Sequence, residues 1–308
     1  MSSIFNNRNN KNEWTLPPVL ETTPKCKLTV MNAGFSKINN KHLLKGANSS
    51  DVLVPALFFL IEHPIHGYIL FDTGYSTRFY EATKSFPFSI MNRLTPVQIS
   101  EKDNAVAQLL QMNISTSQIQ TVILSHLHAD HVGGISDFKF STIYVDKREW
   151  EFCQQSKIKL LFKGYLKELI ENIHLSSLKQ LDFDKNGSSY GPFKNTIDLF
   201  NDATVILVPL PGHAIGQFGL LLNISNQERY FLIADSVYVK ENYQKNRGGS
   251  FLSRFAHYNL KQYKSNFPML KQLEIANPNL MMIPTHDSQM YTLFIQKAKK
   301  HHSLIKRK

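Results

Sequence analysis

The sequence predicts an α+β protein in which two packed β-sheets lie inside and helices lie outside. Short runs rich in β-branched and aromatic residues occur in both halves of the chain, and helical segments separate them. No linker rich in glycine, proline or serine divides the 308 residues. We therefore expect one domain over residues 1–308, with a polar N-terminal extension (about 1–24) and a basic C-terminal extension (about 297–308).

The first half of the chain is expected to begin with three strands. The segment HPIHG joins the second strand to the third and is typical of a hairpin connection. A helix follows, because Ser100 and Asp103 have the spacing of a capping box. In chain order we expect strands at residues 26–34, 54–63, 67–74, 120–125 and 141–146, and helices at residues 100–113, 147–152 and 161–173.

The second half is expected to be richer in strands. Two apolar runs flank the turn residues 201–203, which indicates a hairpin. The expected elements are strands at residues 195–200, 204–210, 217–223, 229–235 and 280–287, and a helix at residues 267–276. Residues 75–100 and 153–192 are expected to be insertions around the functional site.

The composition is that of a water-soluble protein. The longest apolar run, residues 52–61, holds ten residues and contains Pro55, whereas a helix that spans a bilayer needs about 20. The N-terminal residues are polar and lack the apolar core of a secretory signal. We therefore expect a cytoplasmic protein without a membrane partner.

The net charge of +11 raises the question of nucleic-acid binding. Residues 1–50 carry seven basic and two acidic residues, and residues 297–308 carry six basic residues and no acidic one. The stretch 51–296 between them holds 22 residues of each sign. A nucleic-acid surface is expected as a basic stripe on the folded body, so this distribution argues against a nucleic-acid partner.

Four short segments each place a histidine or an aspartate directly after an apolar strand. They are HLHADH, PGHAIGQ, ADSVY and PTHD. Because strand ends meet at one edge of a sheet, these side chains are expected to gather in space. They supply nitrogen and oxygen ligands of the kind that Zn²⁺ prefers, from His126, His128, Asp130, His131, His213, Asp235 and His286.

The spacing of these ligands favours two metal ions. His126 and His128 point to the same side of an extended loop and can hold one ion, while Asp130 and His131 follow a turn and can hold another. A carboxylate such as that of Asp235 can bridge two cations, which a neutral imidazole cannot. Two adjacent metals that hold a hydroxide between them form an established hydrolytic device.

These segments resemble the metallo-β-lactamase fold superfamily, whose motif is H-x-H-x-D-H. The segments FDTG, SHLHADHVGG, VPLPGHAIGQ, IADSVY and THD occur in the family's order. The resemblance implies an αββα sandwich of two mixed sheets with helices outside. It assigns one zinc to His126, His128 and His213, a second zinc to Asp130, His131 and His286, and the bridge to Asp235; Asp72 would orient ligands from behind. Other divalent metals, such as iron, manganese or cobalt, are compatible with these ligands.

Within the superfamily the chain is most similar to the N-acyl homoserine lactonases, which open the lactone ring of quorum-sensing signals. Tyr238 lies three residues after Asp235, where those enzymes place a tyrosine beside the metals. The resemblance implies quorum quenching by a hydroxide that bridges the metals and attacks the lactone carbonyl. Tyr238 would stabilise the carbonyl oxygen, and Asp130 would carry a proton to the leaving alkoxide.

Other activities on the same fold stay open. A related hydrolase could act on thioesters, phosphodiesters or β-lactams with the same metals. A flavodiiron-type redox enzyme is disfavoured, because His128 stands where that group has a carboxylate. A nuclease similar to the tRNA 3′-processing enzymes is disfavoured by the neutral body. The expected partner is a small-molecule ester or lactone, and the sequence leaves a homodimer open.

Overall fold

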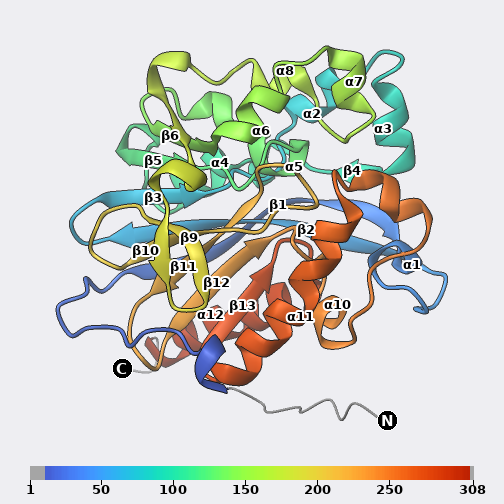
Figure 1. Ribbon diagram of the computed structural model, residues 1–308. Coiled ribbons are helices and arrows are strands. Elements are labelled where there is room, and N and C mark those ends of the chain that lie inside the picture. The colour runs from blue at the N-terminus through green and yellow to red at the C-terminus, as the bar shows by residue number, and fades with distance from the viewer. Residues whose placement is uncertain (1–10, 306–308) are drawn as a thin grey trace, which may run out of the picture.

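Two mixed β-sheets packed face to face form the centre of the protein, in a computed structural model that describes residues 11–305 (Figure 1). The first sheet has the strand order β4-β1-β2-β3-β5-β6-β7, and the second has the order β13-β12-β11-β10-β9-β8. The strands are β1 (Lys27–Asn39), β2 (Asp51–His63), β3 (Gly67–Phe71), β4 (Val97–Gln98), β5 (Ile119–Ile123), β6 (Thr142–Asp146), β7 (Leu178–Leu181), β8 (Ser188–Tyr190), β9 (Phe193–Asp198), β10 (Val205–Pro209), β11 (Phe218–Asn223), β12 (Arg229–Ala234) and β13 (Leu280–Pro284).

Helices cover the outer faces of both sheets, so the predicted αββα sandwich is confirmed. Helices α2 to α8 lie over the first sheet, and α10 and α11 lie on the side of the second sheet (Figure 1). The helices are α1 (Asn40–Leu43), α2 (Arg78–Ala82), α3 (Ser89–Leu94), α4 (Ala105–Gln111), α5 (Ala129–Val132), α6 (Lys147–Phe152), α7 (Lys157–Leu161), α8 (Lys167–Ile170), α9 (Phe183–Asn186), α10 (Lys240–Gln244), α11 (Leu260–Ala276) and α12 (Ser288–Ile305).

The apolar run of β2 explains why the sheets stack. Successive strand residues point to opposite faces, and in β2 both faces are buried. Phe58 and Leu60 belong to the core under the helices, whereas Leu57, Phe59 and Ile61 belong to the core between the two sheets. All five side chains are fully buried. Each such side chain contributes about 1.5–3 kcal/mol through burial, so a solvent-exposed face of β2 is strongly disfavoured.

Strand β10 repeats this arrangement in the second sheet. Val205 and Leu207 face the core between the sheets, and Ile206 and Val208 face the core beneath α11. A continuous apolar run is therefore the sequence signature of an inner strand in this sandwich, whereas simple alternation would mark a strand with one exposed face.

The strand directions bring four strand ends to one edge of the sandwich. In the first sheet, β5 runs parallel to β3 and β6. In the second sheet, β11 is antiparallel to both β10 and β12, and β12 is parallel to β13, so β10, β12 and β13 share one direction. The loops that follow β5, β10, β12 and β13 carry the histidine and aspartate segments.

Three predicted helices differ from the structure. The expected helix at residues 161–173 is interrupted by Gly164, whose φ of +86° is left-handed, and only α8 is helical beyond it. The expected helix at 100–113 begins at Ala105, because the Ser100–Asp103 capping box closes a 3₁₀ turn instead. Helix α11 begins at Leu260, before the expected residue 267, because the Asn259 side chain caps it and Pro268 is tolerated inside it.

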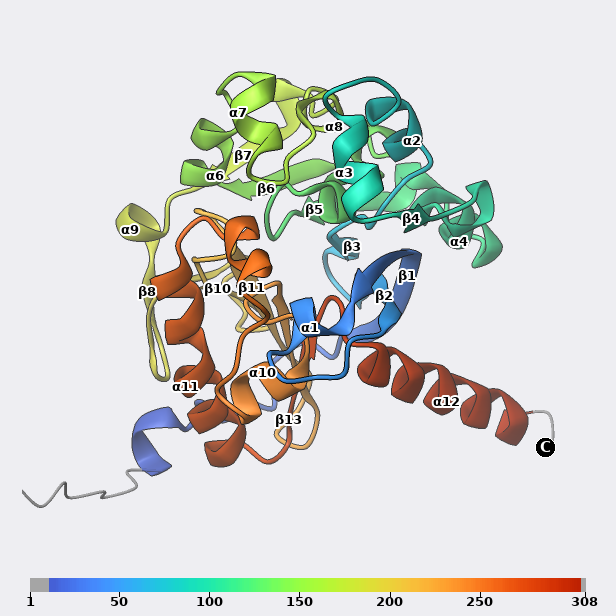
Figure 2. The ribbon, with the colours of Figure 1, turned by 90° about the vertical axis from the view of Figure 1, so that its right-hand side faces the viewer.

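The described parts of the two expected extensions are folded. Residues 1–10 and 306–308 lie outside the described residues. Residues 11–24 run along the second sheet, where the Leu16 amide donates to Asn277 at 2.9 Å and the Arg229 guanidinium donates to the Pro17 carbonyl at 2.8 Å. Residues 297–305 continue α12, which projects from the body (Figure 2). Among residues 11–305, no helix combines the length and apolarity that crossing a membrane requires.

Candidate metal centre

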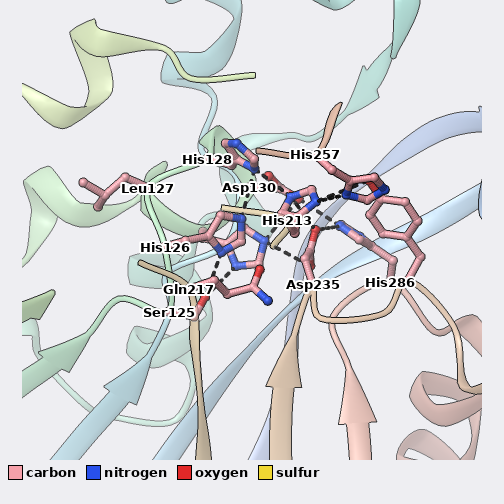
Figure 3. A network of polar contacts seen from close by, with 12 residues as sticks. Ser125, His126, Leu127, His128, Asp130, His213, Gln217, Asp235, His257 and His286 are labelled. Atoms are coloured by element: carbon pink, nitrogen blue, oxygen red, sulfur yellow. Dashed lines mark hydrogen bonds and ion pairs between the residues drawn. The ribbon is translucent and has the colours of Figure 1, made fainter. Parts of the chain in front are cut away.

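The predicted ligand residues lie together in space at the edge where the four strands end. The loop after β5 supplies His126 and His128, and α5 supplies Asp130 and His131. The loops after β10, β12 and β13 supply the others, which are His213, Asp235 and His286 (Figure 3). All except Asp130 are buried as whole residues. Their donor atoms form two groups, each of which could hold a metal ion.

The first group consists of three histidines whose ring nitrogens converge. His128 Nδ1 lies 3.0 Å from His126 Nε2 and 2.9 Å from His213 Nε2 (Figure 3). Burial lowers the pKa of His128 to about 4 and holds the pKa values of His126 and His213 well below the ordinary range. Neutral imidazoles present lone pairs, and a cation placed among three lone pairs removes their mutual repulsion.

The outer nitrogens of this group fix the ring orientations. His128 Nε2 donates to the Lys163 carbonyl at 2.9 Å, and His126 Nδ1 lies 3.1 Å from Ser125 Oγ. Since a carbonyl can only accept, His128 carries its proton on the outer side and keeps the inner nitrogen free. Metal-ligating histidines have this arrangement, with the second nitrogen bound to an oxygen acceptor.

The second group combines two carboxylates with two histidines. His286 Nε2 lies 3.1 Å from both Asp130 Oδ2 and Asp235 Oδ2. His131 Nε2 lies 3.5 Å from Asp130 Oδ2 and 3.4 Å from Asp235 Oδ1. His131 Nε2 and Asp235 Oδ1 are buried and have no hydrogen-bond partner among the described residues. Such unpaired buried atoms are costly unless an ion or another ligand satisfies them.

The carboxylates make the second group attract positive charge. Burial opposes protonation of His286, but Asp235 and then Asp130 outweigh it and raise its pKa to about 10. Burial likewise opposes charge on His131, and the same carboxylates with Asp72 raise its pKa well above the ordinary value. A divalent cation can replace these protons, so the donor set fits a metal ion.

Asp235 links the two groups. Its Oδ2 lies 3.4 Å from His213 Nε2 in the first group and 3.1 Å from His286 Nε2 in the second. Burial raises the pKa of this carboxyl, but His286 and His131 outweigh burial and hold the pKa well below its usual range. An ionised carboxylate between two sets of ligands has the position from which it could bridge two cations.

Asp72, which the resemblance places behind the ligands, contacts the candidate ligand His131. Its carboxylate accepts from the Ser125 amide at 2.7 Å, from Ser125 Oγ at 2.8 Å and from His131 Nδ1 at 2.8 Å. Asp72 has a positive φ of 61° and is fully buried. Its contacts orient His131 so that the Nε2 atom points toward Asp130 and Asp235.

The cavity beside the two groups has a volume of about 200 Å³. Five of the seven metal-ligand candidates line it together with Tyr238, namely His128, Asp130, His213, Asp235 and His286. The Tyr238 hydroxyl lies 3.4 Å from His213 Nδ1. Much of the remaining lining is apolar. Residues of both predicted insertions contribute to the lining, which includes Ile38, Leu43, Val54, Tyr75, Phe79, Met91, Lys163 and Gly164.

Two buried residues of the site carry no signal in the sequence. His257 Nδ1 lies 3.2 Å from His213 Nδ1 (Figure 3). The His257 ring stacks on Tyr263, with the ring centroids 3.7 Å apart. Glu149 accepts from the amides of Leu127 at 3.1 Å and Gly216 at 3.0 Å, so it ties the first histidine loop to the loop of His213. Neither residue follows a strand end, which is the feature that identified the ligands.

A third histidine cluster does not fit a metal. His63, His66 and Asp202 lie within reach of one another. However, His63 Nδ1 accepts from the amides of Ile65 at 3.1 Å and His66 at 3.2 Å. His63 Nε2 therefore carries the proton and donates toward Thr204 Oγ1 at 3.0 Å or Asp202 Oδ2 at 3.1 Å. Because Nδ1 already accepts, Nε2 could bind a metal ion only if the neutral ring lost its last proton and became an imidazolate.

Gly212 places His213, and we expect Gly212→Ala to destabilise the protein by about 3 kcal/mol. Its φ is +133°, and a Cβ there would lie 2.2 Å from the Tyr263 amide nitrogen in α11. Chemical denaturation measures the loss. Gly248→Ala is the control, because its nearest atom would be 3.7 Å away. Equal stability of the two variants would contradict the conclusion that the position of Gly212 beside α11 has no room for a side chain.

Known proteins are similar to this chain in sequence and in fold. The N-acyl homoserine lactonase AttM of Rhizobium radiobacter is 26% identical over 221 residues, which cover 70% of this chain and 78% of the relative. A solved N-acyl homoserine lactone hydrolase, with N-hexanoyl-L-homoserine bound at its catalytic metal centre, superposes with a TM-score of 0.69. Its identity is 21% over 88% of this chain and 96% of that one. The structure of AidC, a dizinc quorum-quenching lactonase, gives a TM-score of 0.61 at 16% identity, with 89% and 91% covered.

These likenesses confirm the metallo-β-lactamase fold and identify the protein as a metal-dependent hydrolase. The family model described as "Anti-Pycsar protein Apyc1" matches residues 102–262. The matched part contains the histidine segment after β5, the loop of His213, and both Asp235 and Tyr238. With more than half of its length matched, the chain belongs to the Anti-Pycsar protein Apyc1 family.

Proposed function

We propose that this hydrolase is a dinuclear zinc enzyme that opens a lactone ring of the N-acyl homoserine lactone type. The observation that carries the proposal is the position of the Tyr238 hydroxyl, which lines the same cavity as the two ligand groups joined by Asp235. Relatives named as N-acyl homoserine lactonases support the choice of substrate.

The donor atoms suit two zinc ions. His126, His128 and His213 would hold one ion, Asp130, His131 and His286 the other, and Asp235 would bridge them. The buried His131 Nε2 and Asp235 Oδ1 atoms support this assignment, because neither has a hydrogen bond among the described residues and a metal ion could satisfy both. When bound, the ions supply Lewis acidity and a hydroxide nucleophile at neutral pH.

Tyr238 would act as a hydrogen-bond donor to the lactone carbonyl oxygen. Burial raises the pKa of its hydroxyl well above the usual value, and the nearby Tyr263 and Asp235 raise it further. The hydroxyl therefore stays protonated at neutral pH and can stabilise the negative charge that develops on the oxygen.

Asp130 would carry a proton to the leaving alkoxide. Its side chain is only 13% exposed, Asp130 lines the cavity, and its Oδ2 lies 3.1 Å from His286 Nε2. Its pKa is held well below the usual range, because His131 and His286 outweigh the effect of burial. An ionised carboxylate can accept a proton during attack and release it when the ring opens.

The acyl chain of the substrate would pack against the apolar part of the cavity lining, which includes Phe79 and Met91.

A substrate panel tests the proposal. Protein of measured zinc content is given N-acyl homoserine lactones of increasing chain length, a glutathione thioester, a β-lactam and bis(4-nitrophenyl) phosphate. We expect the highest kcat/KM for a lactone. Faster hydrolysis of any other class would replace the lactonase assignment while keeping the hydrolase.

The family match favours a second candidate, an anti-Pycsar function, as the family's description states. In that case the same candidate metal centre would hydrolyse a bond other than the ester bond of a lactone. The phosphodiester arm of the panel separates a phosphodiesterase from a lactonase on this fold.

Tyr238→Phe is expected to lower kcat for the lactone by about 100-fold, which is the usual cost of removing one oxyanion donor. Zinc content should not change, because the hydroxyl is not one of the ligands. Steady-state kinetics and metal analysis measure the two effects. Tyr243→Phe is the matched control, since its hydroxyl donates to Glu274 away from the cavity. Unchanged lactone turnover in Tyr238→Phe would exclude the proposed role.

A further inference from the structure

A second and larger cavity, of about 720 Å³, lies on the side of α11. It is formed by the loop after α1 and by the connection between α10 and α11, two segments that lie close together in Figure 2. The Lys45 amide joins them by donating to the Gly248 carbonyl at 2.8 Å, and His42 Nδ1 lies 2.6 Å from Ser250 Oγ. The cavity is therefore a built feature of the fold.

Its lining carries charge of one sign. Lys45, Arg247, Arg254 and Lys264 line the cavity, and no aspartate or glutamate does. Within residues 11–305, none of these four side chains pairs with a carboxylate. A cavity lined by one sign of charge concentrates the field and attracts counter-ions. The concentration is local, because residues 51–296 hold equal numbers of acidic and basic residues.

The other wall suits an organic group. Leu260 and Pro268 contribute accessible carbon surface from α11, with the buried rings of Tyr263 and Phe267 beneath them. The volume falls within the range of small-molecule sites, about 300–1,000 Å³, and far exceeds the space that one inorganic anion needs. Arginine forks match the oxygens of phosphate, and a phosphomonoester carries close to two negative charges at neutral pH.

We propose that this cavity binds a small organic phosphate, whose phosphate group contacts the four basic side chains and whose organic part packs on Leu260 and Pro268. We define it as the basic cavity. It differs from the cavity beside the candidate metal centre, which is lined by members of both ligand groups. The two cavities are neighbours along the chain. His257 lines the basic cavity, and the preceding residue, Ala256, lines the cavity beside the candidate metal centre.

Calorimetric titration of the zinc-loaded protein with phenylphosphonate tests this proposal. The probe carries an aromatic ring and a C–P bond that hydrolysis does not break. We expect it to bind more tightly than inorganic phosphate, which lacks the ring, and more tightly than benzoate, which carries one charge. Equal affinity for benzoate would contradict the phosphate assignment, and absence of binding would overturn the proposal.

A matched pair of double variants locates the binding. R247Q/K264Q removes two charges from the basic cavity. K245Q/K261Q removes two charges from the same connection and the same helix, at exposed residues outside the lining. We expect the first variant to bind phenylphosphonate at least about tenfold more weakly, and the second to bind within about twofold of the parent. Equal affinities in the two variants would place the probe at the metal centre and exclude the basic cavity.

Discussion

Asp235→Ala is expected to reduce hydrolysis by at least about a thousandfold, with bound zinc falling from about two ions per chain to one or fewer. The reason is that, among the described residues, Asp235 is the one carboxylate within 3.4 Å of histidines in both groups. Removal of the Asp235 side chain takes one ligand from each proposed zinc ion. It also removes a negative charge that balances the positive charge of the two ions. Mass spectrometry of the digested protein measures the zinc, and lactone hydrolysis measures the rate.

Asp202→Ala is the control for this variant. Asp202 also pairs with histidines, His63 and His66, in a cluster whose protonation excludes metal binding. We expect its zinc content and its rate to equal those of the parent. If Asp235→Ala keeps both zinc ions, the assignment of Asp235 as the bridge is wrong. If it loses the zinc but keeps the rate, the proposed metal-dependent hydrolysis is wrong.

Asp72→Ala is expected to weaken zinc binding by about 10- to 100-fold, although Asp72 is not itself a proposed ligand. The variant leaves the Ser125 amide, the Ser125 hydroxyl and His131 Nδ1 without their acceptor in a fully buried place. His131 can then rotate, and its Nε2 atom no longer has a fixed direction. The same unpaired groups lower the free energy of unfolding by about 2–4 kcal/mol.

Competition with a zinc-binding chelator measures the affinity of the folded variant, and thermal unfolding measures its stability. Asp137→Ala serves as the control, because Asp137 pairs with the partly exposed Arg78 and has no contact with the ligands. We expect that control to bind zinc as the parent does. Should Asp72→Ala lose stability while its zinc affinity stays unchanged, Asp72 would stabilise the fold without positioning His131.

The sequence predicts the two-sheet sandwich and the gathering of the candidate ligands at one edge, because both depend on local patterns. An apolar run such as that of β2 must be buried on both faces, and a polar residue directly after such a run must lie at a sheet edge. Asp72 follows the same rule after β3. The ligand set can therefore be found without knowledge of the tertiary contacts.

Residues that reach the site from outside the strand ends cannot be found in this way. Glu149 lies in the helical segment KREWEF, where its spacing is that of any helix residue, and only the packing of α6 brings it to Leu127 and Gly216. His257 lies in the irregular connection before α11. The interruption of the expected helix at Gly164 also cannot be predicted from the sequence, because a glycine inside a helical pattern is often tolerated.

The distribution of the ligand residues between the two sheets has a consequence for folding. One ligand segment follows β5 of the first sheet, and the other three follow strands of the second. Metal ions bound by ligand residues from both sheets would connect two layers that are formed by distant parts of the chain, and a chelator could remove this connection. Metal loading would then add to the cohesion of the whole sandwich as well as to its chemistry, since binding energy available only to the native arrangement favours that arrangement.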